Sequence, residues 1–289
     1  MGPEIAVRPI SAPALAYARL VDFVAIAARL ALRRRRDRSR VTREYDDGAW
    51  RALAGARAWE HAADLIDFLV GRDDRLVVCK VGGRVVRIPR REYYRIRMRA
   101  LGGLMQTYAG HVETLVELGC GFGYNLFSLV TTRRWPTLLG FDISSNAVTA
   151  ARQIATHFGV PGVQFDLIDV TEPGHRGFAS VSGRTVFTYF VLEQVPRAVP
   201  QVLENLLAAG PRRVIHIEPA AEFLDPRRPG DWSNYLYIRS VDYQRRLRST
   251  VRTLAGRGVV RILEERRLDW APTIHNDGSL IVWEPRDRR

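Results

Sequence analysis

The chain has 289 residues, of which 46% are hydrophobic and 9% aromatic, which excludes a disordered polymer. The length allows one large domain, or a core of about 200 residues with a smaller attachment. A formal net charge of +13 would ordinarily favour nucleic acid or anionic lipid as a partner. However, Lys80 is the only lysine among many arginines, which indicates a bias of coding composition, so nucleic acid is the less favoured partner.

The cysteines and the early apolar stretch exclude two further classes of protein. Cys79 and Cys120 cannot build a disulfide framework, and no CxxC or Cys/His pair indicates zinc. The most apolar early segment, 14–32, carries three charged side chains, so no transmembrane segment is expected. Without a visible secretory signal, we expect a cytoplasmic protein.

Residues 1–90 predict a mainly helical N-terminal extension that ends in a hairpin. Segment 14–32 is an amphipathic helix, followed by the arginine run 33–36. Such a helix can lie on a membrane or a nucleic acid, or pack on its own domain. We expect the extension to be a lid or an oligomerisation element, and a homo-oligomer stays open. The apolar stripe of the first helix consists of Leu20, Phe23, Val24, Ala27, Leu30 and Ala31.

The rest of the extension contains two more expected helices and the hairpin. The helices are predicted at 49–56 and 58–70. Two β-rich runs within 76–88 flank Gly82-Gly83, a pattern typical of a hairpin.

From residue 91 to 289 the pattern predicts a second, larger unit. A helix comes first, with Tyr94, Met98 and Leu101 on its apolar stripe. Strands and helices then alternate, which favours a parallel sheet with helices on both faces. Strands are expected at 113–118, 137–142, 163–168, 185–189, 213–218, 259–267 and 279–283, and helices at 125–132, 145–158, 199–209 and 241–254. The long connection 220–239, rich in aromatic residues, is expected to be a loop that forms a lid or a substrate wall.

A glycine-rich loop, VELGCGFGYN, follows the first of these strands and opens a helix. Gly119, Gly121 and Gly123 let the backbone turn tightly and approach a bound ligand. A dinucleotide fold would need its third glycine at position 124, where the chain has Tyr124. Glu117 would repel a pyrophosphate but attract the sulfonium and ammonium groups of a methionine moiety. The loop therefore selects a cationic ligand.

This loop resembles that of the class I S-adenosylmethionine-dependent methyltransferases, and the resemblance covers roughly residues 91–285. It implies an α/β, Rossmann-like, doubly wound sheet of about seven strands with the last strand antiparallel. It also implies S-adenosyl-L-methionine as the cofactor, with its methionine part on the glycine loop. By the same resemblance Asp142 and Ile143 meet the ribose, and Asp169 and Val170 meet the adenine. Tyr94 is expected to close over the cofactor.

Four side chains are candidates for acid–base or acceptor contacts. Glu193 follows the fourth strand in YFVLEQVP, a stretch that resembles one of this family; because two of three metal-ligand positions of a metal-dependent branch are missing there, no metal is expected. His216 and Glu218 share one face of the fifth strand, and His275 precedes the final strand. Three of them have an ordinary alternative: His216 as a core histidine, Glu218 as an ion-pair partner of an arginine and His275 as a residue of a hairpin turn.

We therefore expect a methyltransferase that acts on an O or N atom of a small molecule, such as a specialised metabolite. The alternatives are an RNA or protein methyltransferase that uses the arginine-rich arm, or a cofactor-fold module that binds a partner without catalysis.

Overall fold

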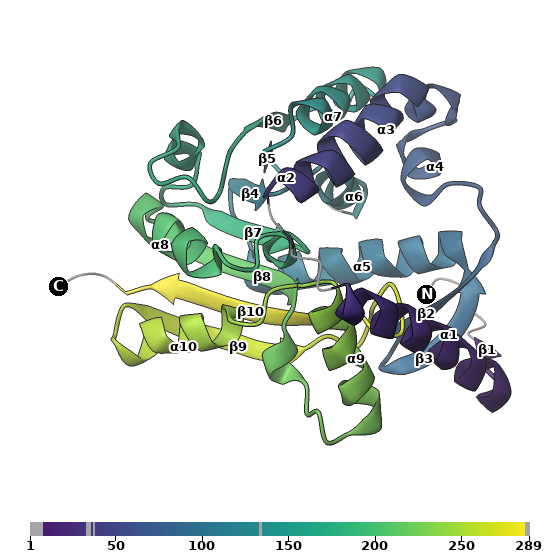
Figure 1. Ribbon diagram of the computed structural model, residues 1–289. Coiled ribbons are helices and arrows are strands. Elements are labelled where there is room, and N and C mark those ends of the chain that lie inside the picture. Colours follow the sequence, from purple (N-terminus) through teal and green to yellow (C-terminus); the bar gives the residue numbers. More distant parts are fainter. Residues whose placement is uncertain (1–7, 33–35, 37, 133–134, 287–289) are drawn as a thin grey trace.

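The computed structural model describes residues 8–32, 36, 38–132 and 135–286 and contains one large and one small sheet (Figure 1). The large sheet has the strand order β6-β5-β4-β7-β8-β10-β9. Only β10 runs antiparallel to its neighbours, so the expected Rossmann-like sheet of seven strands with an antiparallel last strand is confirmed. The strands span Thr114–Leu118 (β4), Thr137–Asp142 (β5), Val163–Leu167 (β6), Thr185–Tyr189 (β7), Arg213–Pro219 (β8), Val260–Arg267 (β9) and Gly278–Pro285 (β10).

Helices cover both faces of this sheet because successive strand residues are buried on opposite sides. Leu115 packs with the helices of one face and Val116 with those of the other. The first face carries α5 (Arg90–Tyr108), α6 (Tyr124–Thr132) and α7 (Ser145–His157), and the second carries α8 (Val199–Ala209) and α10 (Leu247–Gly256). The carboxyl ends of the parallel strands are thus framed by helices on either side.

The N-terminal extension contains helices and the small sheet β1-β3-β2. The expected hairpin is present as β2 (Leu76–Val81) and β3 (Arg84–Pro89), which β1 (Arg8–Pro9) extends. The helices are α1 (Ala12–Ala31), a continuous run of α2 (Arg38–Val41), the π-helix η1 (Thr42–Trp50) and α3 (Arg51–Ala56), and then η2 (Ala58–His61) and α4 (Leu65–Val70). Within the described ranges, none of the helices combines the length and apolarity needed to cross a membrane.

Three expected elements differ from the structure. The helix predicted at 58–70 is interrupted, because Asp64 caps a new helix by accepting the N–H of Asp67 (2.7 Å). The expected loop 220–239 instead contains η5 (Ala221–Phe223) and α9 (Pro229–Ser240), which has proline in its first turn. The helix predicted from 241 begins only at Leu247, whose N–H donates to the Gln244 side chain (3.1 Å).

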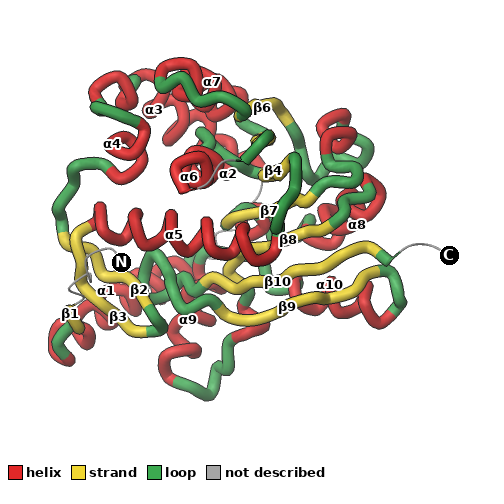
Figure 2. The backbone as a smooth tube through the Cα atoms, turned by 180° about the vertical axis from the view of Figure 1, so that it is seen from behind, coloured by secondary structure: helices red, strands yellow, loops and turns green. Residues whose placement is uncertain are grey.

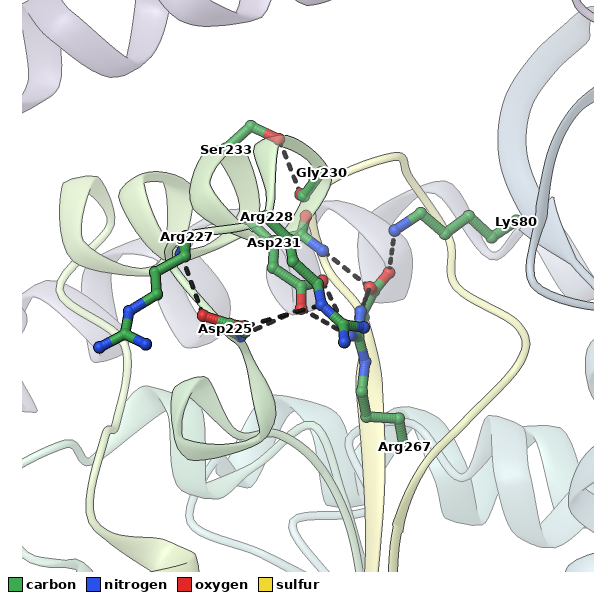
Figure 3. A network of polar contacts seen from close by, with 10 residues as sticks. Lys80, Asp225, Arg227, Arg228, Gly230, Asp231, Ser233 and Arg267 are labelled. Atoms are coloured by element: carbon green, nitrogen blue, oxygen red, sulfur yellow. Dashed lines mark hydrogen bonds and ion pairs between the residues drawn. The ribbon is translucent and has the colours of Figure 1, made fainter.

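A polar network fixes α9 and the small sheet to the end of the large sheet (Figure 3). Lys80 on β2 contacts Asp277 Oδ1 at 2.5 Å, and Arg267 on β9 contacts Asp277 Oδ2 at 2.7 Å. Arg267 also pairs with Asp231 of α9 (2.8 Å). Backbone bonds between Lys80 and Ala271 join the same regions. The only lysine is therefore a structural cation.

Candidate functional site

The glycine loop connects β4 to α6 with three left-handed glycines. Gly119, Gly121 and Gly123 have φ values of 74°, 54° and 88°. A Cβ on Gly119 would lie 2.6 Å from Val191 Cγ1, and one on Gly121 would lie 3.0 Å from the Trp50 ring. Both the backbone angles and the crowding require glycine here. The loop also borders a cavity of about 980 Å³.

Glu117 is fully buried at the carboxyl end of β4. Asn125 on α6 donates to its Oε1 atom at 2.6 Å, whereas Oε2 has no hydrogen-bond partner among the described residues. Burial raises the pKa of the Glu117 carboxyl to about 8, although Asn125 and the charge of Arg97 oppose this. Glu117 therefore lies directly before the glycine loop with one oxygen that has no partner among the described residues.

The two acids predicted to bind the nucleoside both border the same cavity. Asp142, at the end of β5, accepts the N–H of Gly121 (2.8 Å) and that of Ser144 (2.9 Å). Asp169 accepts the N–H and hydroxyl of Thr171 at 2.9 and 2.7 Å. Ile143 and Val170 also line the cavity, and Ile143 is exposed. The structure thus brings most of the expected cofactor residues together around the cavity, Tyr94 included, whereas Glu117 and Gly123 do not line it.

The N-terminal extension covers this cavity. The continuous helix 38–56 lies beside α7 (Figure 1), and its residues Tyr45, Asp46, Trp50 and Leu53 line the cavity. Its Asp46 accepts hydrogen bonds from the hydroxyl of Ser144 and the N–H of Asn146. Its Trp50 packs against Phe122 of the glycine loop, with ring centroids 5.5 Å apart. Contacts between residues about a hundred positions apart could not be read from local sequence patterns.

Arg97 is the functional candidate that the sequence patterns missed. It comes from α5, which runs across the middle of the view in Figure 2, and lies between the rings of Tyr124 and Tyr189, 4.4 and 4.5 Å from their centroids. Its guanidinium donates to Tyr189 Oη (3.0 Å) and Asn125 Oδ1 (2.7 Å) and borders the cavity. The sequence did carry a signal that Arg97 faces the interior, because it lies four residues from both Tyr93 and Leu101, which are buried on α5.

None of the four acid–base candidates borders the cavity. Glu218 accepts the N–H groups of Val191 and Leu192 (3.0 and 3.1 Å), and burial raises the pKa of its carboxyl to about 7. Val191 itself lines the cavity, so Glu218 holds a segment of the wall. His216 is buried against Thr188 (3.0 Å), and burial lowers the pKa of its imidazole to about 3.

Glu193 and His275 do not line the cavity either. Glu193 Oε1 accepts from Gln194, which does line the cavity, and burial raises the pKa of the Glu193 carboxyl well above its usual range. His275 contacts Asp22 of α1 (3.1 Å) and stacks on Tyr237. In the described part of the chain, no group of three His, Cys, Asp or Glu side chains could hold a metal ion.

Part of the chain is similar to a known protein family, and its fold is similar to solved structures. A family model described as a methyltransferase domain matches residues 111–205, which include the glycine loop. No curated protein matches the sequence. Among solved structures, geranyl diphosphate C-methyltransferase from Streptomyces coelicolor A3(2) is 14% identical, with a TM-score of 0.50 over 67% of this chain and 80% of that chain. Magnesium protoporphyrin IX methyltransferase from Synechocystis PCC 6803 is 17% identical, with a TM-score of 0.47 over 68% and 81%.

The matched segment begins just before β4 and ends within α8, so it contains the glycine loop and the residues that follow β5 and β6. The fold around it is the seven-stranded sheet that the loop predicted. Residues 111–205 therefore match a methyltransferase domain, which supports an enzyme that uses S-adenosylmethionine as its cofactor.

Proposed function

We propose that this enzyme methylates an O or N atom of a compact small molecule, such as a specialised metabolite. The observation that carries the proposal is the covered cavity of about 980 Å³. This volume is at the upper end of the range for small-molecule sites, which leaves room for an acceptor beside the cofactor. Aromatic side chains line much of it, as expected for a flat or apolar acceptor: Tyr45, Trp50, Phe68, Tyr93, Tyr94, Phe122, Tyr124, Tyr189 and Phe190.

The residues present fit S-adenosylmethionine, whose sulfonium supplies an electrophilic methyl group when bound. We assign the ammonium to the unpartnered oxygen of Glu117 and the carboxylate to Arg97, because Glu117 directly precedes the glycine loop and Asn125 bonds to both side chains. Asp142 suits the ribose diol, and Asp169 with Val170 suits the adenine edge. Ile143 and Tyr94 supply apolar walls.

We assign residues 1–90 as a lid and residues 91–289 as the catalytic core. The lid's Asp46 bonds to Ser144 and Asn146 of the core, and Trp50 covers Gly121. These contacts exclude water from the space beside the glycine loop, which strengthens the electrostatic contacts of Glu117 and Arg97 with a ligand. The lid therefore excludes water and positions the ligand.

At the acceptor end, the chain offers polar groups but no acid or base of the predicted set. Gln194 and Tyr45 line the cavity, and Gln194 donates to Tyr45 Oη (3.2 Å) and to Glu193 Oε1 (2.7 Å). We propose that Gln194 orients the acceptor, while Glu193 and Glu218 position the segment after β7. A neutral amide suits an acceptor that arrives already deprotonated.

Incubation with methyl-labelled S-adenosylmethionine tests the proposal. Phenols, carboxylic acids and amines form one panel, and transfer RNA, ribosomal RNA and protein form the other. We expect label in the first panel only. Label in RNA alone, with binding that falls steeply as salt rises, would instead favour an RNA methyltransferase that binds RNA through the arginine-rich N-terminal arm. Cofactor binding without transfer to either panel would favour the non-catalytic module.

A further inference from the structure

Helix α1 presents its apolar stripe to solvent instead of to the protein. Leu20, Phe23 and Val24 are 61%, 46% and 62% exposed. Leu30 and Leu32 are exposed as well, whereas Ile26 is the only buried residue among those of α1 whose burial is described. The expected helix is therefore present, but its stripe is not used for packing within the chain. A surface helix of a globular protein ordinarily has the reverse arrangement.

The exposed stripe continues onto α9, which lies beside α1 at one edge of the molecule (Figure 1). Phe23 stacks on Trp232 of α9, with centroids 6.1 Å apart and the rings 24° from parallel. Trp232 is itself 44% exposed. The two helices thus form one apolar patch, which we call the α1–α9 patch: Leu20, Phe23, Val24, Leu30 and Trp232. Contiguous patches of this kind indicate an interaction surface.

The exposed charges described around the patch are mainly positive. Arg29 on α1 and Arg239 in the last turn of α9 are exposed, as are Arg227 and Arg228 just before α9. Two acids nearby already have protein partners: Asp22 contacts the His275 imidazole at 3.1 Å, and Asp225 contacts Arg228 at 3.6 Å. An apolar stripe with tryptophan and phenylalanine beside arginines matches an anionic lipid surface in both polarity and charge.

We propose that the α1–α9 patch docks the enzyme on anionic lipid bilayers. The twenty residues of α1 would lie in the plane of the interface, over a length of about 30 Å. Leu20, Phe23, Val24 and Trp232 would enter the boundary between headgroups and acyl chains, while the arginines face lipid phosphates. A second copy of this chain is the less favoured occupant, because two such patches would bring like charges together.

Flotation with vesicles tests the proposal on the full chain. We expect binding to vesicles made of equal parts phosphatidylglycerol and phosphatidylcholine, and little binding to phosphatidylcholine alone. Raising the salt from about 0.05 M to about 0.5 M should weaken the binding, since it screens the arginines. The double variant F23S/V24S should lower the partition coefficient roughly tenfold or more, because it removes apolar area without disturbing a core.

The matched control is I66S/L263S, which replaces two exposed apolar residues on α4 and β9, outside the patch. It should bind vesicles like the parent. Both variants should retain the parent's circular dichroism spectrum and affinity for S-adenosylhomocysteine, which shows that they fold. Absence of vesicle binding by the parent, or equal loss in both variants, would overturn the proposal. A parent dimer that F23S/V24S dissociates, with no vesicle binding, would assign the patch to a second copy instead.

Discussion

Replacing Glu117 by glutamine separates the charge of this side chain from its shape. The amide oxygen can still accept the N–H of Asn125, but the side chain can no longer ionise. Because the pKa of Glu117 is raised from 4.5 to about 8, the folded chain keeps a proton between these pH values that the unfolded chain loses. The free energy of unfolding of the parent, without cofactor, should therefore fall by about 1.4 kcal/mol per pH unit as pH rises through this window.

Glu117→Gln should remove that pH dependence, which sums to roughly 5 kcal/mol at the top of the window. The variant should thus be more stable than the parent at high pH, but it should bind the cofactor more weakly. Losing a charge-assisted contact of about 1.5–3 kcal/mol raises the Kd for S-adenosylmethionine roughly 10- to 150-fold. Urea unfolding across this pH range and calorimetric titration measure the two effects. If the free energy of unfolding fell equally with pH in the parent and in Glu117→Gln, and both bound S-adenosylmethionine with the same Kd, the role given to Glu117 would be refuted.

Three further variants test other parts of the site and fold. Gly119→Ala should abolish cofactor binding, because its Cβ would collide with Val191; Gly174→Ala, also at positive φ but in open space, is the control and should bind normally. Trp50→Ala should raise the KM for S-adenosylmethionine several-fold with little loss of stability, since Trp50 is only half-buried. Trp50→Phe should bring the KM part of the way back to that of the parent. A KM for Trp50→Ala equal to that of the parent would argue against the lid. Lys80→Met should lower the free energy of unfolding by about 1–3 kcal/mol without changing cofactor Kd, because it leaves part of Asp277 unpaired; a changed Kd would contradict a purely structural role.

The strands of the core could be predicted from sequence because their signal is local. Runs of apolar residues bounded by turn residues placed β4 and β5 within a residue of their observed bounds. The glycine loop was equally local, since three glycines after a strand and an acid at its end define a backbone shape and a charge. Helix α9 was missed because Gly230 and Asp231 resemble a turn, and its aromatic residues show no clear helical period.

The walls of the cavity could not be predicted because they depend on contacts between distant segments. Asp46 meets Ser144 across 98 positions, and Arg97 meets Tyr189 across 92. No spacing rule links such pairs. Arg97 resembled its solvated neighbours on α5, and only the fold shows that it lies between two tyrosine rings. Similarly, the apolar stripe of α1 was evident in sequence, but its exposure was not.

Calorimetric titration of the full chain with S-adenosylmethionine and S-adenosylhomocysteine tests the central claim most directly. We predict one saturable site for each ligand, with a micromolar or tighter Kd that is lost in Gly119→Ala and retained in Gly174→Ala. Binding of neither ligand by the parent chain, or unchanged binding by Gly119→Ala, would contradict the assignment of the cofactor to the glycine loop.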